Sequence, residues 1–157
     1  MIVFQDFYRN YKDSLLAYLL RMTGEYEASR DLMQESFTRC LERYGRDGCK
    51  PSLLFTIARN AVYDRSRHIR VQERSELQRR PESVHPEEHH LLREEYRRVL
   101  NAIQQLNPDE KDLLSLAATG IYSYRQIAQQ VGISEANVKV KIHRSRMKLK
   151  KLLDEGE

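Results

Sequence analysis

Hydrophobic residues recur along this chain at helical spacing, and no stretch alternates in the manner of a β-strand. The first stripe comprises Phe4, Tyr8, Tyr11, Leu15, Tyr18 and Met22. Gly24 ends that helix, a second is predicted over residues 25–44 before Gly45, and a third begins near Pro51. The 157 residues are 32% charged, which is high for one compact globule and favours two small all-α domains.

Residues 71–90 interrupt this pattern with few hydrophobic side chains, two prolines and charges of both signs. The composition predicts a polar linker that is extended or only partly helical. We therefore expect one helical domain over residues 1–70 and another over residues 91–157. In the second domain, Asn107-Pro108-Asp109-Glu110 predicts a capped helix start and Gly120 the end of that helix.

The cysteine content and the hydropathy of the sequence indicate the cellular compartment in which the protein works. Cys40 and Cys49 are the two cysteines, they form no CxxC motif, and no hydrophobic run approaches the ~18 residues of a membrane span. This is typical of a reduced cytoplasmic protein without membrane insertion of its own. A disulfide or redox switch stays open, although nothing in the spacing favours one.

The C-terminal third has the pattern of a helix-turn-helix. Residues 123–126 (Ser-Tyr-Arg-Gln) form a capping box for a short helix. Ala128 allows the two helices to approach, and Gly132 permits the positive backbone angle of the turn. Ser134 can cap the second helix, predicted from Glu135 to about Leu153, with Val138 filling the angle between the helices.

The second helix carries a basic block, since residues 138–151 contain seven Lys or Arg and no acid. Candidate base-reading positions are Glu135, Ala136, Asn137 and Lys139. Expected phosphate contacts are Lys141, Arg144, Arg146 and Lys148. Ser123, Tyr124, Arg125 and Ser134, at the two helix starts, complete the candidate DNA contacts. An ordinary helical hairpin with a solvated charged face is the alternative, but the caps and the acid-free block together favour DNA binding.

The segment YSYRQIAQQVGISEANVKVKIHRSRMKL resembles the DNA-binding part of region 4 in the extracytoplasmic-function (ECF) sigma factors of the sigma-70 family. Alone, it is equally similar to the helix-turn-helix of LuxR-type regulators. Residues 31–37 (DLMQESF) resemble the region 2.2 signature, and residues 53–68 (LLFTIARNAVYDRSRH) resemble regions 2.3 and 2.4. Three motifs in the expected order, covering nearly the whole chain, separate the sigma factors from the LuxR-type proteins.

The resemblance implies an alternative sigma factor, not an enzyme, that needs no metal or cofactor. It implies partners in core RNA polymerase (the β′ coiled coil and the β flap), in promoter DNA and in an anti-sigma factor. The implied polymerase contacts are Asp31, Leu32, Gln34, Glu35 and Phe37. Of these, Asp31, Gln34 and Glu35 share one helix face by their spacing, which without the resemblance could equally be a solvated acidic surface.

Recognition of the −10 promoter element is implied for Arg59, Asn60, Tyr63, Asp64, Arg67 and His68. Arginines for phosphates, with an aromatic ring and an amide for exposed bases, suit single-stranded DNA. Asp64 and Arg67 can instead pair on the helix surface, and we slightly favour that structural role. The helix-turn-helix would then read the −35 element.

Several positions depart from the family pattern. Leu53 replaces the usual tryptophan, so any stacking role of that ring is lost. In the recognition helix, Asn137 replaces the usual threonine, Val140-Lys141 the usual Ser-Arg pair, and Ser145 is the small residue before Arg146. These recognition-helix changes put the particular −35 sequence beyond prediction.

Parts of the sequence are also compatible with two other functions. One is a conventional helix-turn-helix repressor or activator that does not join polymerase. The other is a metal-dependent enzyme using His85, His89 and His90 with Glu87 and Glu88. Pro86 and the absence of a helical HExxH motif argue against the enzyme.

Overall fold

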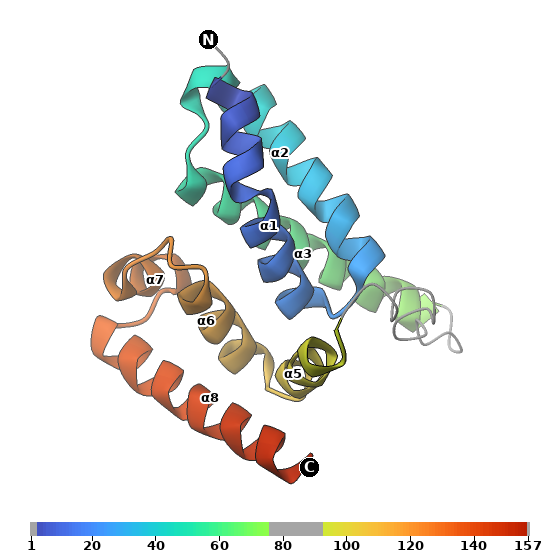
Figure 1. Ribbon diagram of the computed structural model, residues 1–157, viewed down its shortest axis with the longest axis vertical. Coiled ribbons are helices and arrows are strands. Elements are labelled where there is room, and N and C mark those ends of the chain that lie inside the picture. The colour runs from blue at the N-terminus through green and yellow to red at the C-terminus, as the bar shows by residue number, and fades with distance from the viewer. Residues whose placement is uncertain (1–2, 76–92, 157) are drawn as a thin grey trace.

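The computed structural model describes residues 3–75 and 93–156, which form seven helices and no strand within those ranges (Figure 1). The N-terminal helices are α1 (Val3–Thr23), α2 (Tyr26–Gly48) and α3 (Pro51–Ser75). The C-terminal helices are α5 (Glu94–Gln104), α6 (Pro108–Ala118), α7 (Tyr124–Val131) and α8 (Glu135–Glu155). The expected all-α class is confirmed. We call α1–α3 the N-terminal module and α5–α8 the C-terminal module.

The N-terminal module is a three-helix bundle around the hydrophobic stripe of α1. Leu15 and Tyr18 of that stripe, and Leu19 beside them, are completely buried. At the outer end of α1, Phe7 makes an edge-on contact with Phe37 of α2, with ring centroids 5.9 Å apart. Burial of these large side chains fixes the faces that α2 and α3 turn toward solvent.

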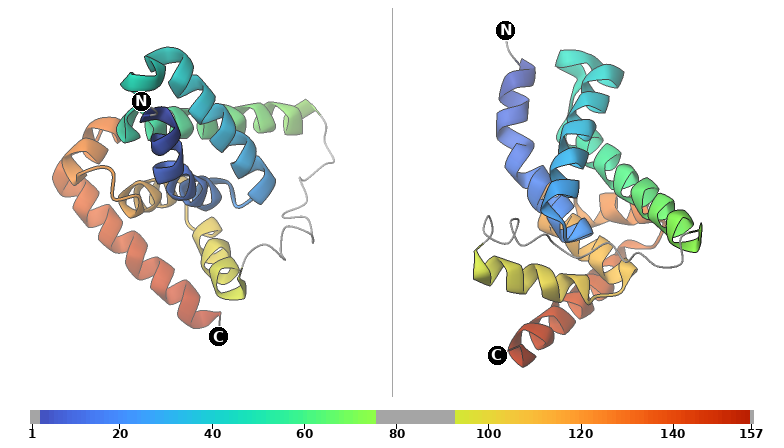
Figure 2. Two further views of the ribbon diagram at one scale, coloured as in Figure 1. Left: turned by 45° about the horizontal axis from the view of Figure 1, so that its top comes forward. Right: turned by 90° about the vertical axis from the view of Figure 1, so that its right-hand side faces the viewer.

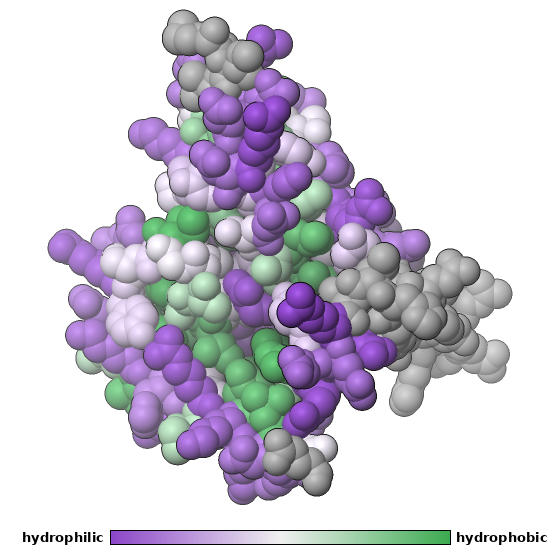
Figure 3. All heavy atoms as spheres, in the orientation of Figure 1, coloured by the Kyte–Doolittle hydropathy of each residue, from purple (hydrophilic) through white to green (hydrophobic). Residues whose placement is uncertain are grey.

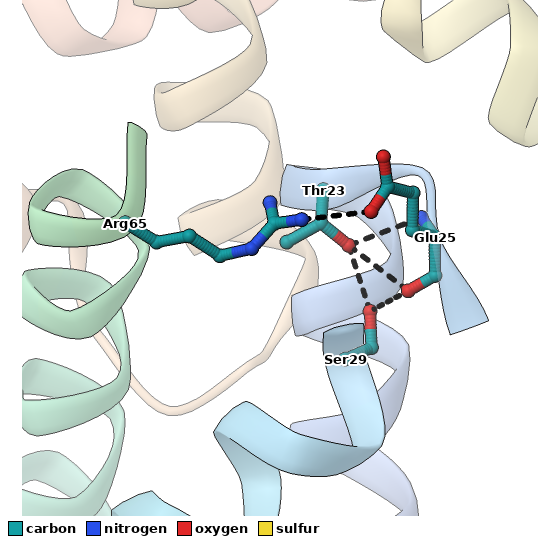
Figure 4. Close-up of polar contacts among 4 residues, drawn as sticks. All are labelled: Thr23, Glu25, Ser29 and Arg65. Atoms are coloured by element: carbon teal, nitrogen blue, oxygen red, sulfur yellow. Dashed lines mark hydrogen bonds and ion pairs between the residues drawn. The ribbon is translucent and has the colours of Figure 1, made fainter. Parts of the chain in front are cut away.

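A small polar network holds the α1–α2 turn against α3 (Figure 4). The Thr23 hydroxyl accepts from the Glu25 backbone N–H at 3.1 Å and lies 2.8 Å from the Ser29 hydroxyl. The Glu25 carboxylate pairs with the Arg65 guanidinium of α3 at 2.7 Å. This ion pair orients the middle of α3 relative to the rest of the bundle.

The ends of α2 and α3 differ from the expected ones. Gly45 takes a positive φ of 72° and interrupts α2 where a break was expected, but one further turn continues to Gly48. The α3 helix continues to Ser75, so residues 71–75 of the predicted linker are helical. These residues contain no glycine or proline to stop the helix, and Gln72 contacts His68 one turn earlier at 3.3 Å. Residues 76–90 of the predicted linker lie outside the described residues.

The predicted caps of the C-terminal module are confirmed. Asn107 and Glu110 exchange hydrogen bonds of 2.9 and 3.0 Å at the start of α6. Ser123 and Gln126 do the same at the start of α7. The Ser134 hydroxyl accepts from the Asn137 N–H at 3.1 Å, and so it caps α8. Gly132 adopts the left-handed conformation, with φ 83°, that turns α7 into α8.

The two modules pack against each other. α1 contacts both α5 and α6, as the two views of Figure 2 show. Leu113, Leu116 and Ile127 of the C-terminal module belong to the same core as Tyr18 and Phe55 of the N-terminal module. The helices of residues 3–75 and 93–156 include none that is long and apolar enough to cross a membrane.

Candidate nucleic-acid interface

The polar face of α2 is the expected polymerase contact. Asp31, Gln34 and Glu35 are all exposed, as their spacing predicted. The Gln34 amide donates to the Tyr8 hydroxyl of α1 at 3.4 Å, and Glu35 pairs with Arg39 one turn later. The three side chains therefore form one accessible polar patch, which we call the α2 face.

Leu32 and Phe37, predicted beside them as polymerase contacts, are only 6% and 3% exposed. The same helical periodicity that exposes Asp31 turns Leu32 and Phe37 inward, so direct contact of these two with polymerase stays a prediction. The Phe37 ring lies 4.7 Å from that of Tyr8, centroid to centroid, and 6.4 Å from that of Phe4. Both residues hold α2 in place beneath the α2 face.

The six predicted −10 contacts on α3 fall on two different faces. Asn60, Asp64, Arg67 and His68 are exposed. The Asp64 carboxylate lies 3.6 Å from the Arg67 guanidinium, so the pairing that we slightly favoured is present. Arg59 and Tyr63 instead turn toward the C-terminal module.

Arg59 forms a two-point ion pair with Asp112 of α6. Its Nε and Nη2 atoms donate to the two carboxylate oxygens at 3.1 and 2.7 Å. The Arg59 and Asp112 side chains are only 15% and 5% exposed. Burial lowers the pKa of Arg59, but the hydrogen bond and the charge of Asp112 outweigh it and raise the pKa above its usual value.

Tyr63 completes this buried cluster. The Arg59 guanidinium lies over its ring, 4.9 Å from the centroid. Burial, and next the negative charge of Asp112, raise the pKa of Tyr63 to about 12. Sequence reasoning missed Asp112. The sequence held one signal for it, because Asp112 lies four positions before Leu116 and so shares the inward side of α6 with that leucine.

Other hydrogen bonds cross between the modules beside this pair. The Tyr122 hydroxyl donates to the Ser52 carbonyl at 2.9 Å and lies 3.2 Å from the Thr56 hydroxyl. The Gln104 amide donates to the Arg21 carbonyl at 2.8 Å. The Arg21 guanidinium in turn donates to the carbonyl of Ser115 at 3.1 Å.

The helix-turn-helix presents its second helix outward. Val138, Ile142 and Ser145 bury the inner side of α8, as expected. The predicted base-reading and phosphate positions Glu135, Ala136, Asn137, Lys139, Lys141, Arg144, Arg146 and Lys148 are all exposed. Of the contacts expected at the helix starts, Ser123, Arg125 and Ser134 are exposed and Tyr124 is half-buried.

Two of these basic residues are already paired. Lys148 lies 2.9 Å from Glu110 of α6, and this hydrogen bond is the main reason that the pKa of Glu110 is lowered. Lys139 lies 4.0 Å from Glu135 on the same helix.

Figure 3 shows hydrophilic residues over the outer side of α8 and hydrophobic residues gathered between α8 and the other C-terminal helices.

Val140 and Met147 are two apolar side chains on this outer face that sequence reasoning did not assign. They are 45% and 55% exposed. At 100° per residue, Val140 lies opposite the buried Val138 and Ile142, close to Ala136 one turn earlier. The outward face of α8 is therefore an apolar strip with basic residues on both sides.

The described residues contain no group of His, Cys, Asp and Glu side chains that could hold a metal ion. His85, Glu87, Glu88, His89 and His90 lie outside the described residues. Cys40 and Cys49 are both free thiols, and the Cys49 thiol donates to the Gly45 carbonyl at 3.2 Å. Burial raises the pKa of Cys40 to about 12, which keeps this thiol protonated and unreactive near neutral pH.

Comparison with known proteins agrees with this arrangement. A model of sigma-70 region 2 matches residues 7–74, and a model of sigma-70 region 4 matches residues 96–149. The chain is 30% identical to the RNA polymerase sigma factor CarQ of Myxococcus xanthus, over 98% of its own length and 91% of the relative. It is 28% identical to the ECF RNA polymerase sigma factor SigM of Bacillus subtilis, covering 96% and 95% of the two chains.

Among solved structures, the fold is similar to the sigma factor RpoE in complex with the anti-sigma factor NepR from Bartonella quintana. The TM-score is 0.73 at 22% identity, and the match covers 96% of each chain. The matches define a two-module DNA-binding protein of transcription initiation. The chain belongs to the ECF class of RNA polymerase sigma factors, in the sigma-70 family. The region 2 match decides against a LuxR-type regulator and a conventional repressor.

Proposed function

We propose that this sigma factor, which has no catalytic role of its own, binds core RNA polymerase through the α2 face. That face would dock on the coiled coil of the β′ subunit, and the C-terminal module on the β flap. The observation that carries the proposal is the exposure of Asp31, Gln34 and Glu35 above a rigid aromatic cluster. A polar patch on an anchored helix loses little conformational freedom when it binds.

The two DNA contacts are divided between the modules. The proposed −10 reader is α3, with Asn60 and His68 on its open face and Arg59 and Tyr63 on its inner face. The proposed −35 reader is the outward face of α8, with Ser123, Arg125 and Ser134 at the helix starts. Each contact is weak alone, and polymerase raises their joint affinity by holding both modules over one promoter. The protein would act in the cytoplasm, where polymerase and the chromosome are.

An anti-sigma factor is the proposed regulatory partner. The support is the similar solved structure, in which RpoE is in complex with the anti-sigma factor NepR. Affinity purification of the tagged chain from its own host, under several stresses, tests this. Recovery of polymerase alone under every condition would contradict the proposal.

The polymerase assignment is tested by the double variant Gln34→Ala with Glu35→Lys. Because the substitution reverses a charge at the centre of the α2 face, we expect affinity for core polymerase to fall at least about tenfold, with a parallel loss of run-off transcription. The matched control is Ser14→Ala with Asp13→Lys, which likewise removes one polar side chain and reverses one acidic charge, on the exposed side of α1. Unchanged polymerase binding by the α2 variant would show that this face is not the docking site.

A further inference from the structure

Arg59, a proposed −10 contact, forms an ion pair with the Asp112 carboxylate of the C-terminal module. Two nitrogens of its guanidinium meet the two oxygens of Asp112 at 3.1 and 2.7 Å. Arginine holds phosphate oxygens with the same parallel two-point geometry. Asp112 therefore occupies the place that a DNA phosphate would take at Arg59.

We propose that the packed arrangement of the two modules is an autoinhibited state of the free chain, in which Asp112 blocks Arg59 from DNA. Arg59 and Tyr63 can contact the −10 element only when the C-terminal module moves away from α3. Asp112 is then a regulatory residue, and the Arg59–Asp112 pair is a latch between the modules.

The inner face of α3 supports the latch because most of its polar residues contact the C-terminal module. Ser52, Thr56, Arg59 and Tyr63 follow one another at intervals of four, three and four residues, which is one stripe of the helix. Ser52 and Thr56 bond to Tyr122, and Arg59 bonds to Asp112. The contact with the C-terminal module thus covers the stripe from its first turn through Arg59, while Asn60 and His68 stay exposed.

The chemistry of the latch favours reversible opening. A buried ion pair adds little net stability, because each charge loses its hydration, whereas removal of one partner alone is costly. When the modules separate, both charges regain water together, so the intact pair resists opening only weakly. The Tyr18 hydroxyl and the Ser115 hydroxyl, at the same contact, are buried without a hydrogen-bond partner among the described residues, and separation would hydrate them as well.

The inference rests on the proposed function for the role of Arg59 in DNA binding, but its test uses the free full-length chain. Asp112→Asn keeps the shape of the side chain and removes its charge. Small-angle scattering should give a radius of gyration near the ~15 Å of a compact chain of this length for the wild type, and a larger one for the variant. Affinity for a random-sequence single-stranded 20-mer should rise at least about tenfold, because breaking a buried pair shifts the closed state by more than that factor.

Two further variants separate opening from the loss of a negative charge. Glu25→Gln also frees an arginine of α3, Arg65, but within one module. It should leave the radius unchanged and raise DNA affinity far less than Asp112→Asn does. Arg59→Ala in the Asp112→Asn background leaves no uncompensated charge at the contact, so its radius should return toward that of the wild type and the gain in DNA affinity should be lost.

Tyr122→Phe provides an independent opening variant. It keeps the ring and removes the hydroxyl that bonds to Ser52, so a partial increase in radius and a severalfold gain in DNA affinity are expected. An unchanged radius in both Asp112→Asn and Tyr122→Phe, with native helix content by circular dichroism, would overturn the latch. So would an equal gain in DNA affinity from Glu25→Gln, or a gain that survives Arg59→Ala. Failure of the wild type to bind core polymerase would instead contradict the proposed function and leave the scattering result intact.

Discussion

Gly24, in the turn between α1 and α2, leaves room for the Gln104 side chain of the C-terminal module. Filling that space with a methyl group tests the contact between the modules. Gly24 has a φ of +72°, and a Cβ at this position would lie 3.0 Å from the Cδ atom of Gln104. Gly120 has a similar φ of +68°, but a Cβ there would meet no heavy atom within 4 Å. Gly120→Ala therefore measures the backbone cost alone, and Gly24→Ala measures that cost together with displacement of Gln104.

The expected magnitudes follow from these two environments. A residue with a Cβ in the left-handed region costs about 1–2 kcal/mol, partly offset by the lower entropy of the unfolded chain, so we expect about 1 kcal/mol for Gly120→Ala. Displaced Gln104 would lose its bond to the Arg21 carbonyl, at 2.8 Å, and the bond it accepts from Lys111, at 3.2 Å. At about 1 kcal/mol net for each bond, Gly24→Ala should cost about 3 kcal/mol in total.

Urea unfolding followed by circular dichroism gives both free energies of unfolding. The same two glycine variants in a Gln104→Ala background complete a double-mutant cycle, in which the extra cost of Gly24→Ala should disappear. Equal destabilisation by Gly24→Ala and Gly120→Ala in the wild-type background would refute the reasoning. That result would mean that Gln104 does not reach the α1–α2 turn in solution.

Three further predictions concern α8 and the half-buried Tyr63 of α3. Arg144→Ala should reduce the slope of log affinity against log salt concentration by about 0.9, as expected for one lost phosphate contact. Lys148→Ala should reduce this slope less, because Lys148 also pairs with Glu110. Fluorescence anisotropy over a salt series measures both slopes. Val140 is an exposed apolar side chain on the outward face of α8, and such side chains contact thymine methyl groups in the major groove. Uracil in place of one −35 thymine should therefore weaken binding by the wild type severalfold and leave binding by Val140→Ser unaffected in a gel-shift competition. Because the folded chain holds the proton of Tyr63 to about pH 12 and the unfolded chain releases it near pH 10, this group's contribution to stability is present below about pH 10 and is lost between pH 10 and 12. Tyr63→Phe should flatten that part of the stability profile in urea titrations at pH 9 and 11, and an unaltered profile would argue against the burial.

Local rules predicted the parts of the fold that depend on neighbouring residues. The Asn107 cap, the Ser123 capping box and the left-handed Gly132 are all present, because each rests on contacts within about four residues. The position of the helix-turn-helix followed from the same short-range signals. Helical spacing also predicted that Asp31 and Gln34 are exposed.

Contacts between residues far apart in the sequence could not be predicted in the same way. Within residues 31–37 the helical period places Leu32 and Phe37 inward, beneath the exposed residues of the motif. Arg59 and Asp112 are 53 positions apart and lie on different modules. Periodicity shows that one side of α3 is buried, but it does not show which helix covers it.

The two proposed DNA-binding faces therefore differ in exposure, which the sequence could not reveal. The outward face of α8 is exposed while the modules are packed together, whereas Arg59 and Tyr63 of α3 are covered. DNA binding by the free chain should thus come mainly from α8, with the steep salt dependence of phosphate contacts and little dependence on Arg59. If polymerase holds the modules apart, as proposed, Arg59 becomes available and its substitution should weaken promoter binding. The double variant Arg59→Ala with Asp112→Asn leaves no unpaired charge at the contact, so it compares these two states in the free chain and in the holoenzyme. An equal loss of DNA affinity in both would show that α3 is already open.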